Sequence, residues 1–459
     1  MLRRLVLALL ALNFASVAYG QAWTTAPRTP AWVANPTVGD GSTTWGGTPP
    51  AFAYQPSPIE NAAGYDRSKW IIGAAESYVD GGEAKFRITC NFSHFGQFDP
   101  ILFFGQANAG HHHTFIGNKN TGPSSTFQTL RNSPASTCSG GPLNGTAYWE
   151  PTLFGKTPSG AFAPIKPNVV SFYYTHALTK GAKKVRLPRG LAFIGGVNPA
   201  DFDNTSRNAE IPAGQGWMPA YDGFRGWACY NGGTNIPVAT GPYAGQSHAR
   251  QLKNADGSDP WGGNCVAGLT LIAEMNAPDC WDGHNLTSPN GRDHFRYSIK
   301  PSSNQSLSLC PNGWWSVPVF EVKTEFSHNG WADYQHWYLS SDRMDPNPAN
   351  WRPNGSTFHF DWMNGWEDQT LERWHSQCNG VTTATGGTPV EKTCGSSTIS
   401  ANERMRGGMI NEFPEAGQES FSNSPIISFP TYHDDPPTER YGAVVSGSTH
   451  DNVTLQSKH

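Results

Sequence analysis

The sequence predicts a mainly β protein, an antiparallel β-sandwich or jelly-roll-like domain with few short helices, stapled by disulfides. The chain of 459 residues contains 50 glycines and 36 prolines, which are common in turns and depleted inside strands and helices. Its 17 tryptophans and 24 phenylalanines supply the apolar area that a large core needs. Eight cysteines, none of them in a C-x-x-C pair, favour disulfides over a metal cluster.

The first twenty residues have the pattern of a secretory signal peptide. Arg3-Arg4 precedes the apolar run 5–12, and a small-x-small cleavage pattern follows at Ala18-Tyr19-Gly20, so we assign residues 1–20 to a signal peptide. The apolar run is too short for a membrane span, and no later segment has the length that a bilayer needs. We therefore expect a secreted or periplasmic protein without a membrane span.

Three further regions follow in order. Residues 21–84, rich in Pro, Gly, Thr and Trp, are predicted to form an extended N-terminal arm. Residues 85–395 are predicted to form a single β-rich catalytic or binding domain, and 396–459 a polar C-terminal tail. Runs enriched in β-branched or aromatic residues predict five strands, at 85–90, 101–104, 169–174, 191–194 and 269–273. The spacing of Leu371, Trp374 and Cys378 predicts a helix over 367–378.

The segment Gly110–Asn118, with three successive histidines, is the first candidate site. In a strand, alternation places His111, His113 and Phe115 on one face and His112 on the other. Two imidazoles on one face suit a metal site or the proton transfers of a reaction. The competing interpretation is a rim strand whose histidines only form hydrogen bonds.

The segment Phe358–Trp366 repeats this pattern. Alternation places Phe358, Phe360 and Trp362 on one face, and His359 and Asp361 with Met363 on the other. An imidazole and a carboxylate two residues apart in a strand suit a metal site, or a base with its orienting partner.

Asp282, Arg292 and His294 lie in a turn-rich region between these two segments. A cleft-edge loop there would present binding groups on a rigid scaffold. The alternative is local, because Asp282-Gly283 is itself a turn signal and its carboxylate would then only cap the turn.

Local loops suggest two disulfides, Cys378–Cys394 and Cys265–Cys280. Closing the first loop would contribute roughly 3 kcal/mol in the chain-entropy model. Eight cysteines allow 105 pairings, so the sequence leaves the overall connectivity open.

An ordered set of motifs between about His94 and Cys378 resembles a secreted family of fungal and bacterial proteins, the domain-of-unknown-function family DUF1996. The matching segments are His94-Phe95, 98–101, Gly105-Gln106, 110–117, 147–151, 280–283, Cys310-Pro311 and 359–366. The family often has an apolar residue where this chain has His112, and a His-Pro-Val-like stretch near 314–317. The resemblance implies an exported protein that accompanies cell-wall or biomass turnover, and it brings no activity with it.

Sugar binding needs exposed aromatic rings beside polar groups. The candidates for substrate binding are Tyr148, Trp149, Trp281, Trp362, Trp366, Arg292 and Asn364. For each tryptophan the alternative is core packing, because tryptophans are highly buried on average.

The leading hypothesis is a secreted carbohydrate-active enzyme that cleaves an extracellular polysaccharide in an aromatic-lined cleft. The candidate catalytic residues are Asp99, His111, His113, Asp282, His294, His359 and Asp361. Hydrolysis would use two carboxylates, whereas elimination on a uronic-acid polymer would use a base and a group that neutralises the carboxylate.

The rival hypothesis is a noncatalytic extracellular metal- or glycan-binding protein. The candidate ligands of one divalent ion are His111, His113, His359 and Asp361, a set that suits zinc, copper or iron. A net charge of −4 with scattered basic residues argues against a nucleic-acid partner. The oligomeric state stays open.

Overall fold

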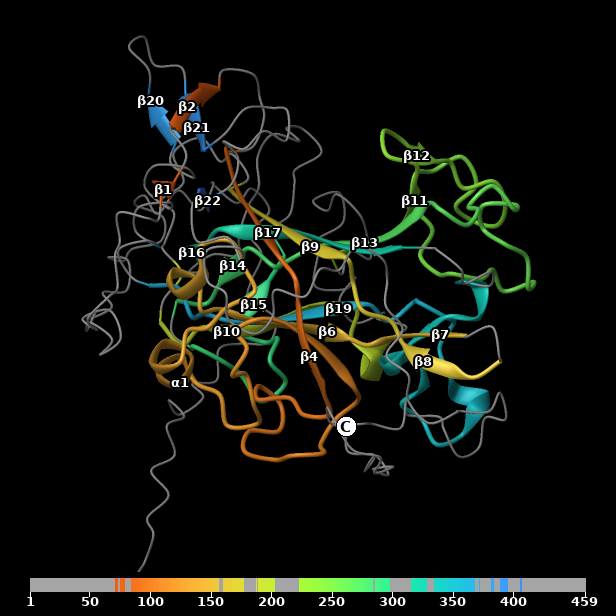
Figure 1. Cartoon of the computed structure of the whole chain (residues 1–459), viewed down its shortest axis with the longest axis horizontal. Helices are drawn as coiled ribbons and strands as arrows, with labels where there is room; N and C mark the ends of the chain where they lie inside the picture. Colours follow the sequence, from red (N-terminus) through yellow and green to blue (C-terminus); the bar gives the residue numbers. More distant parts are fainter. Residues whose placement is uncertain are drawn as a thin grey trace, which may run out of the picture.

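The fold is described from a computed structural model of the chain (Figure 1). The described residues are 71–72, 75–78, 84–156, 160–176, 187, 189–202, 223–283, 285–297, 315–327, 334–367, 371, 381–383, 389–394 and 405–406. Within them, no helix has the length and apolar character that crossing a membrane requires. The predicted signal peptide and nearly all of the predicted helix at 367–378 lie outside the described residues. The proposed domain boundaries stay predictions.

Two antiparallel sheets form the body of the protein. The smaller has the order β10 (Ala192–Gly196), β19 (His359–Met363), β6 (Ala147–Pro151), β5 (His113–Gly117), β4 (Phe92–Gly96). The larger has the order β12 (Asn235–Ile236), β11 (Phe224–Tyr230), β13 (Thr270–Asn276), β17 (Val319–Ser327), β9 (Val169–His176), β3 (Ala84–Cys90), β21 (Pro389–Cys394), β2 (Ala75–Tyr78), with β20 (Val381–Thr383) paired to β21. One pairing, β21 with β3, is parallel.

Short elements complete the described part of the chain. Smaller sheets join β15 (Phe295–Arg296), β14 (Cys280–Trp281) and β16 (Trp315–Ser316); β18 (Tyr338–Leu339), β7 (Leu153–Lys156) and β8 (Phe162–Pro164); and β1 (Ile71–Ile72) with β22 (Met405–Arg406). The helical elements are α1 (Phe127–Asn132) and the 3-10 turns η3 (Gly141–Leu143), η4 (Pro199–Asp201), η5 (Tyr334–His336), η6 (Ser340–Arg343) and η7 (Pro348–Asn350). The mainly β class with few short helices is thus confirmed for the described residues.

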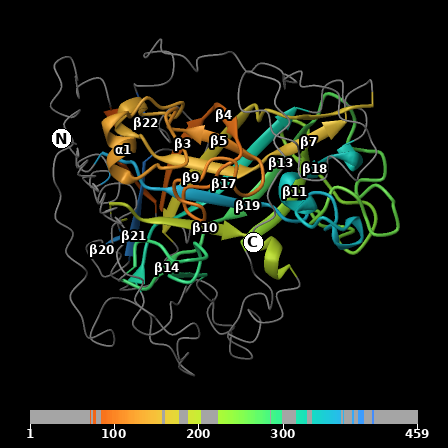
Figure 2. The same ribbon diagram turned by 90° about the horizontal axis from the view of Figure 1, so that it is seen from below.

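The two sheets face each other as a sandwich, with β9 and β17 on one side and β6 and β19 on the other (Figures 1 and 2). Aromatic rings fill the space between them. Tyr148 of β6 stacks on Phe172 of β9 with ring centroids 4.1 Å apart, and Phe360 of β19 packs 5.5 Å from the same ring. Because side chains alternate along a strand, residues next to these core rings point to the outer face of the smaller sheet.

Four of the five strands predicted from apolar runs are present as β3, β9, β10 and β13. The fifth, at 101–104, is wrong, because this segment is a turn. The Asp99 carboxylate accepts hydrogen bonds from the backbone N–H groups of Ile101 and Leu102, at 2.8 and 3.0 Å. A side chain that bonds nearby backbone donors competes with strand pairing. As a result Leu102 and Phe104 are 39% and 56% exposed.

Disulfides staple the sandwich as predicted, although one suggested pairing is wrong. Cys265 pairs with Cys229 rather than with Cys280, and Cys280 is itself disulfide-bonded. The pair Cys378–Cys394 cannot be placed, because Cys378 lies outside the described residues. Closeness in sequence did not predict this pairing, because strands bring together residues that are distant in sequence.

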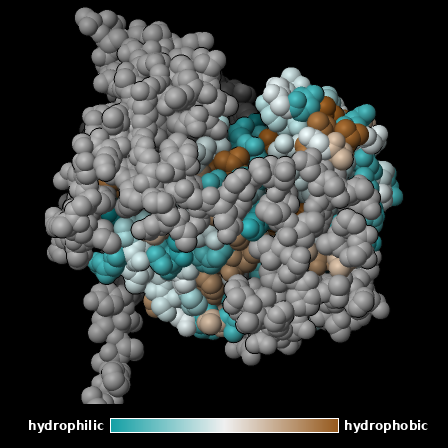
Figure 3. All heavy atoms as spheres, viewed as in Figure 1, coloured by the Kyte–Doolittle hydropathy of each residue, from teal (hydrophilic) through white to brown (hydrophobic). Residues whose placement is uncertain are grey.

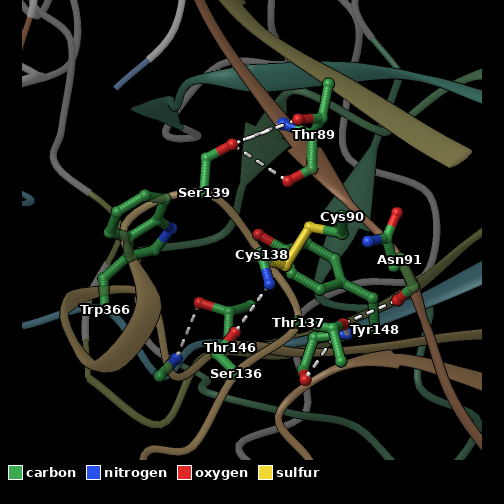
Figure 4. Close-up of a disulfide and its surroundings, with 12 residues drawn as sticks. Thr89, Cys90, Asn91, Ser136, Thr137, Cys138, Ser139, Thr146, Tyr148 and Trp366 are labelled. Atoms are coloured by element: carbon green, nitrogen blue, oxygen red, sulfur yellow. Dashed lines mark hydrogen bonds between the residues drawn. A yellow bond between two sulfur atoms is a disulfide. The ribbon is translucent and has the colours of Figure 1, made fainter. Parts of the chain in front are cut away.

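The bond between Cys90 and Cys138 lies where the chain passes from β3 in the larger sheet to β4 in the smaller (Figure 4). Ser139 and Thr89 form hydrogen bonds beside it, and the Tyr148 ring lies next to the sulfur atoms (Figure 4). The crosslink therefore attaches the end of β3 to the loop after α1, whose Thr137 N–H donates to the Gly117 carbonyl at the end of β5 at 2.9 Å.

Exposed apolar side chains are few. Large hydrophobic residues above a third exposed, among those described, are Leu102, Phe104 and Val266. In the view of Figure 3, hydrophobic residues gather at the upper right, over the region of β11 and β12.

Candidate metal centre

Side chains on the outer face of the smaller sheet converge on one point. His113 on β5 and His359 and Asp361 on β19 point to this face, opposite the core rings, as alternation predicts. Strand β6 runs between β5 and β19, so these residues lie on strands about 10 Å apart. Long imidazole side chains are able to close that distance above β6, whose residue opposite His113 is Pro151.

His111 completes the cluster from the residues just before β5. Its ring centroid lies 4.1 Å from that of His113 and 5.0 Å from that of His359. One ring nitrogen from each of the three histidines lies within 4.8 Å of the other two. Asp99, His113 and Asp361 form a second such group. The structure thus brings together five of the seven residues predicted to be catalytic.

The Nδ1 atoms of two cluster histidines are occupied by backbone carbonyls. His113 Nδ1 lies 2.9 Å from the Phe98 carbonyl and His359 Nδ1 lies 2.9 Å from the Thr357 carbonyl. A carbonyl only accepts, so each Nδ1 must donate its hydrogen. The Nε2 atom of each neutral ring therefore carries a lone pair.

His111 has the same tautomer through a hydroxyl. The Ser340 hydroxyl donates to the His112 carbonyl at 2.6 Å, so its oxygen accepts from His111 Nδ1 at 2.9 Å. The His111 Nε2 lone pair then faces the His359 Nε2 lone pair at 3.1 Å. Two acceptors at that distance repel unless a cation lies between them. A tetrahedral zinc ion with Zn–N bonds of about 2.0–2.1 Å holds two nitrogens about 3.3 Å apart.

Burial keeps these imidazoles neutral, which is the form that binds metal. Desolvation lowers the pKa of His111 to about 4. It also lowers the pKa values of His113 and His359 well below their usual range, with a smaller contribution from the charge of His111. His113 Nε2 is buried and has no hydrogen-bond partner. These nitrogens are therefore available as ligands at neutral pH.

Two buried carboxyl groups border the histidines. Both oxygens of Asp361 are buried without a hydrogen-bond partner. Burial, and then the charge of Asp99, raise the pKa of Asp361 well above its usual range, and burial raises that of Asp99 to about 6. An orphaned buried carboxylate is costly unless it holds a proton or pairs with a cation. With both ionised and Arg292 beside them, the local charge is −1, which a divalent ion would change to +1.

Arg292 lies at the edge of this cluster, where its charge acts on Asp99, Asp361 and His359. Its guanidinium donates to the carbonyls of Gly196 and Val197 at 2.8 and 3.1 Å. These bonds attach it to the end of β10. The structure therefore places Arg292 beside the cluster, as a charge held by backbone contacts.

Asp282 and His294 form hydrogen bonds to residues outside this cluster. Asp282 accepts hydrogen bonds from the backbone and side chain of Asn285, at 2.9 and 2.6 Å, so the turn-capping alternative is the one that its contacts support. Both ring nitrogens of His294 are occupied, by Ser288 Oγ at 3.0 Å and the Ala192 carbonyl at 2.9 Å. Neither residue belongs to the groups of converging ligands.

The aromatic candidates for sugar stacking are packed in the interior. All have no exposed surface: Tyr148, Trp149, Trp281, Trp362 and Trp366. A ring that stacks on a sugar needs an open face, and none of these buried rings offers one. Asn364 is also fully buried, and its Oδ1 accepts from the Trp366 backbone N–H at 3.0 Å.

Ser340 and Thr357, which orient two of the histidines, have no signal in the sequence. Each acts through one oxygen, and hydroxyls and carbonyls occur throughout the chain. The exposed Leu102 and Phe104 were also missed, because their apolar run predicted a strand. They lie on the loop that begins after Asp99 and ends at His111, so both ends of this loop belong to the cluster.

One family model matches the chain. Its description is "Domain of unknown function (DUF1996)", and the match covers residues 99–366. These bounds run from the first acidic residue of the cluster to a residue just beyond β19. No curated protein and no solved structure matches the chain.

Proposed function

The chain belongs to the DUF1996 family, and we propose that it is an exported metal-dependent enzyme that cleaves a polysaccharide. In this proposal His111, His113 and His359 hold one divalent ion. The observation that carries it is the convergence of three imidazole nitrogens whose Nδ1 partners leave the Nε2 lone pairs facing inward. This is the arrangement of protein metal sites, in which the second ring nitrogen is fixed by an outer acceptor.

A divalent ion would supply a Lewis acid that polarises a water or a substrate oxygen. Asp361 and Asp99 supply the two carboxyl groups that hydrolysis requires. Asp99, whose pKa is about 6, accepts a proton from the attacking water, whose oxygen forms a bond to the anomeric carbon. Asp361, which its more strongly raised pKa keeps protonated, donates to the oxygen of the leaving sugar as the glycosidic bond breaks.

Two features support a polymeric sugar as the substrate. The predicted signal peptide would send the protein to where such polymers occur, and Leu102 and Phe104 expose apolar surface on the loop between Asp99 and His111. Exposed apolar side chains beside a site often contact a ligand. In the proposal they replace the buried tryptophans as the sugar-contacting surface.

Metal analysis of the mature protein, purified without chelator or affinity metal, tests the proposal. Wild type should contain one divalent ion per chain and release reducing ends from a polysaccharide in a substrate screen. His111→Ala and His113→Ala should lose both. His112→Ala is the matched control, because His112 points to the opposite side and its Nδ1 bonds Thr152 Oγ1 at 2.7 Å. Metal-free wild type would overturn the proposed centre, and unsaturated products would indicate elimination instead of hydrolysis.

The depth of the cluster favours a second candidate, a noncatalytic metal-binding protein. His111 is 8% exposed, and the other four members of the cluster less. Structural metal sites are closed, whereas catalytic ones keep an open position. Stoichiometric metal with no product from any polysaccharide would favour this candidate.

A further inference from the structure

A buried carboxylate outside the metal cluster ties together two of the groups that orient its histidines. Asp342 lies in η6 and is 1% exposed. Its Oδ1 accepts from the Thr357 backbone N–H and hydroxyl, at 3.1 and 2.7 Å. Its Oδ2 accepts from the backbone N–H groups of Leu339 and Gly355, at 2.8 and 2.6 Å. Four donors on one carboxylate make a rigid, charge-assisted connection.

The two segments that this carboxylate joins are those that carry the outer acceptors. Ser340, two residues before Asp342, accepts from His111 Nδ1. Thr357, which donates twice to Asp342, accepts from His359 Nδ1 through its carbonyl. Ser341 adds a hydroxyl contact of 2.6 Å with Thr357 Oγ1. Asp342 thus fixes the spacing of the acceptors behind the two histidines whose Nε2 atoms lie 3.1 Å apart.

We infer that Asp342 is a positioning residue for the metal centre, which sets the separation of His111 Nε2 and His359 Nε2 by holding Ser340 and Thr357 together. The inference rests on the proposed metal site. It does not make Asp342 a ligand, because all four of its hydrogen bonds point to the segments behind the histidines. Groups that hydrogen-bond a metal-bound histidine typically change metal affinity by about 10–100-fold when they are removed, and Asp342 holds two segments that carry such groups.

Cobalt(II) titration of the metal-free full-length protein tests the inference, read by the visible absorption of the bound ion. Asp342→Asn keeps the size of the side chain but turns an NH₂ group toward backbone donors. We expect its cobalt Kd to rise about 10–100-fold and its absorption bands to shift, because the ligand geometry changes.

Asp345→Asn is the matched control, with the same loss of charge three residues later. Asp345 caps the following turn through the Asn347 N–H and the Asn350 amide. Its Kd should stay within about twofold of wild type.

Thr357→Val decides the question if Asp342→Asn does not fold. It removes the hydroxyl that donates to Asp342 but keeps the carbonyl that holds His359. We expect weaker cobalt binding and a shifted spectrum here too. If Asp342→Asn folds and has the wild-type cobalt affinity and spectrum, the inference is overturned and the proposed metal centre is not. If Asp342→Asn does not fold, the same result in Thr357→Val overturns the inference. A wild-type protein that binds no cobalt would overturn the proposed metal centre and the inference with it.

Discussion

At the scale of single residues, the same side chain has opposite roles according to what its polar atoms meet. His113 and His294 are both buried histidines, yet His294 has a partner on each ring nitrogen, whereas His113 Nε2 has none. An imidazole with hydrogen bonds at both ring nitrogens stabilises the fold, whereas one with an unpartnered nitrogen lone pair is able to bind a ligand. The hydrogen-bond partners of the ring nitrogens therefore distinguish the two histidines, whereas burial does not.

This contrast gives a test at His294. We expect His294→Gln to lower the free energy of unfolding by about 1–3 kcal/mol, because it disturbs buried hydrogen bonds to Ser288 and Ala192. Its metal content should equal that of wild type. Chemical denaturation and elemental analysis of the same preparation measure both quantities. Loss of metal from this variant would place His294 in the centre after all.

Glu150 offers a second test, through pH. Its Oε2 accepts from the Thr324 hydroxyl at 2.7 Å, its Oε1 has no partner, and burial raises its pKa to about 8. The unfolded chain ionises this group above its ordinary pKa of 4.5, whereas the folded protein keeps it protonated to about pH 8. Its contribution to stability is therefore present at low pH and is lost as pH rises between these values, by about 1.4 kcal/mol per unit.

Glu150→Gln, which resembles the protonated acid, should remove that loss. We expect the variant to gain stability relative to wild type as pH rises from 5 to 8, measured by urea unfolding at each pH. A stability difference that is constant across this range would show that Glu150 does not titrate abnormally.

At the scale of elements, the pairing of β10 with β19 supports the site. Gly196 pairs with His359 and has a φ of +87°. A Cβ there would lie 2.7 Å from His359 Cα and 2.6 Å from Met275 Sδ. Glycine is therefore needed at this position for two reasons, the backbone conformation and the close approach of β19.

Gly196→Ala should consequently weaken both the fold and metal binding. The control is Gly232→Ala, whose φ of +83° imposes the same backbone strain but whose Cβ would meet no atom within 4 Å. We expect the control to cost about 1–2 kcal/mol of unfolding free energy and to leave metal content unchanged. Thermal melts and metal analysis compare the two variants, and equal losses would contradict a steric role for the β10–β19 contact.

At the scale of the whole molecule, the disulfide Cys90–Cys138 connects the end of β3 in the larger sheet to the loop after α1. Its loop spans 48 residues, for which the chain-entropy model gives about 4 kcal/mol. The Cys90→Ala/Cys138→Ala variant should lose stability of that order. The loss should appear in denaturant unfolding under oxidising conditions and vanish when both proteins are compared under reducing conditions. A loss that persists after reduction would point to packing at the cysteine sites.

Local rules in the sequence determined the class of the fold and the faces of the two decisive strands. Period-two alternation placed His113 opposite the core, and His359 and Asp361 opposite Phe360 and Trp362, because alternation is a property of any strand wherever it lies. The many turn residues and cysteines likewise indicated a disulfide-stapled β protein. Four members of the candidate site, His111, His113, His359 and Asp361, followed from these local patterns, whereas Asp99 came from the segment that resembles the family.

Only the tertiary structure decided how distant segments meet. The order of the sheet, with β6 between β5 and β19, brings His111 to 3.1 Å from His359 across 248 positions of sequence. The tertiary fold also buried the tryptophans that were expected to bind sugar and paired Cys265 with Cys229. The Asp99 carboxylate turned an apolar run into an exposed loop, and Asp342 bound two remote acceptors together. Except for the local turn at Asp99, each of these depends on long-range pairing, for which neighbouring residues carry no signal.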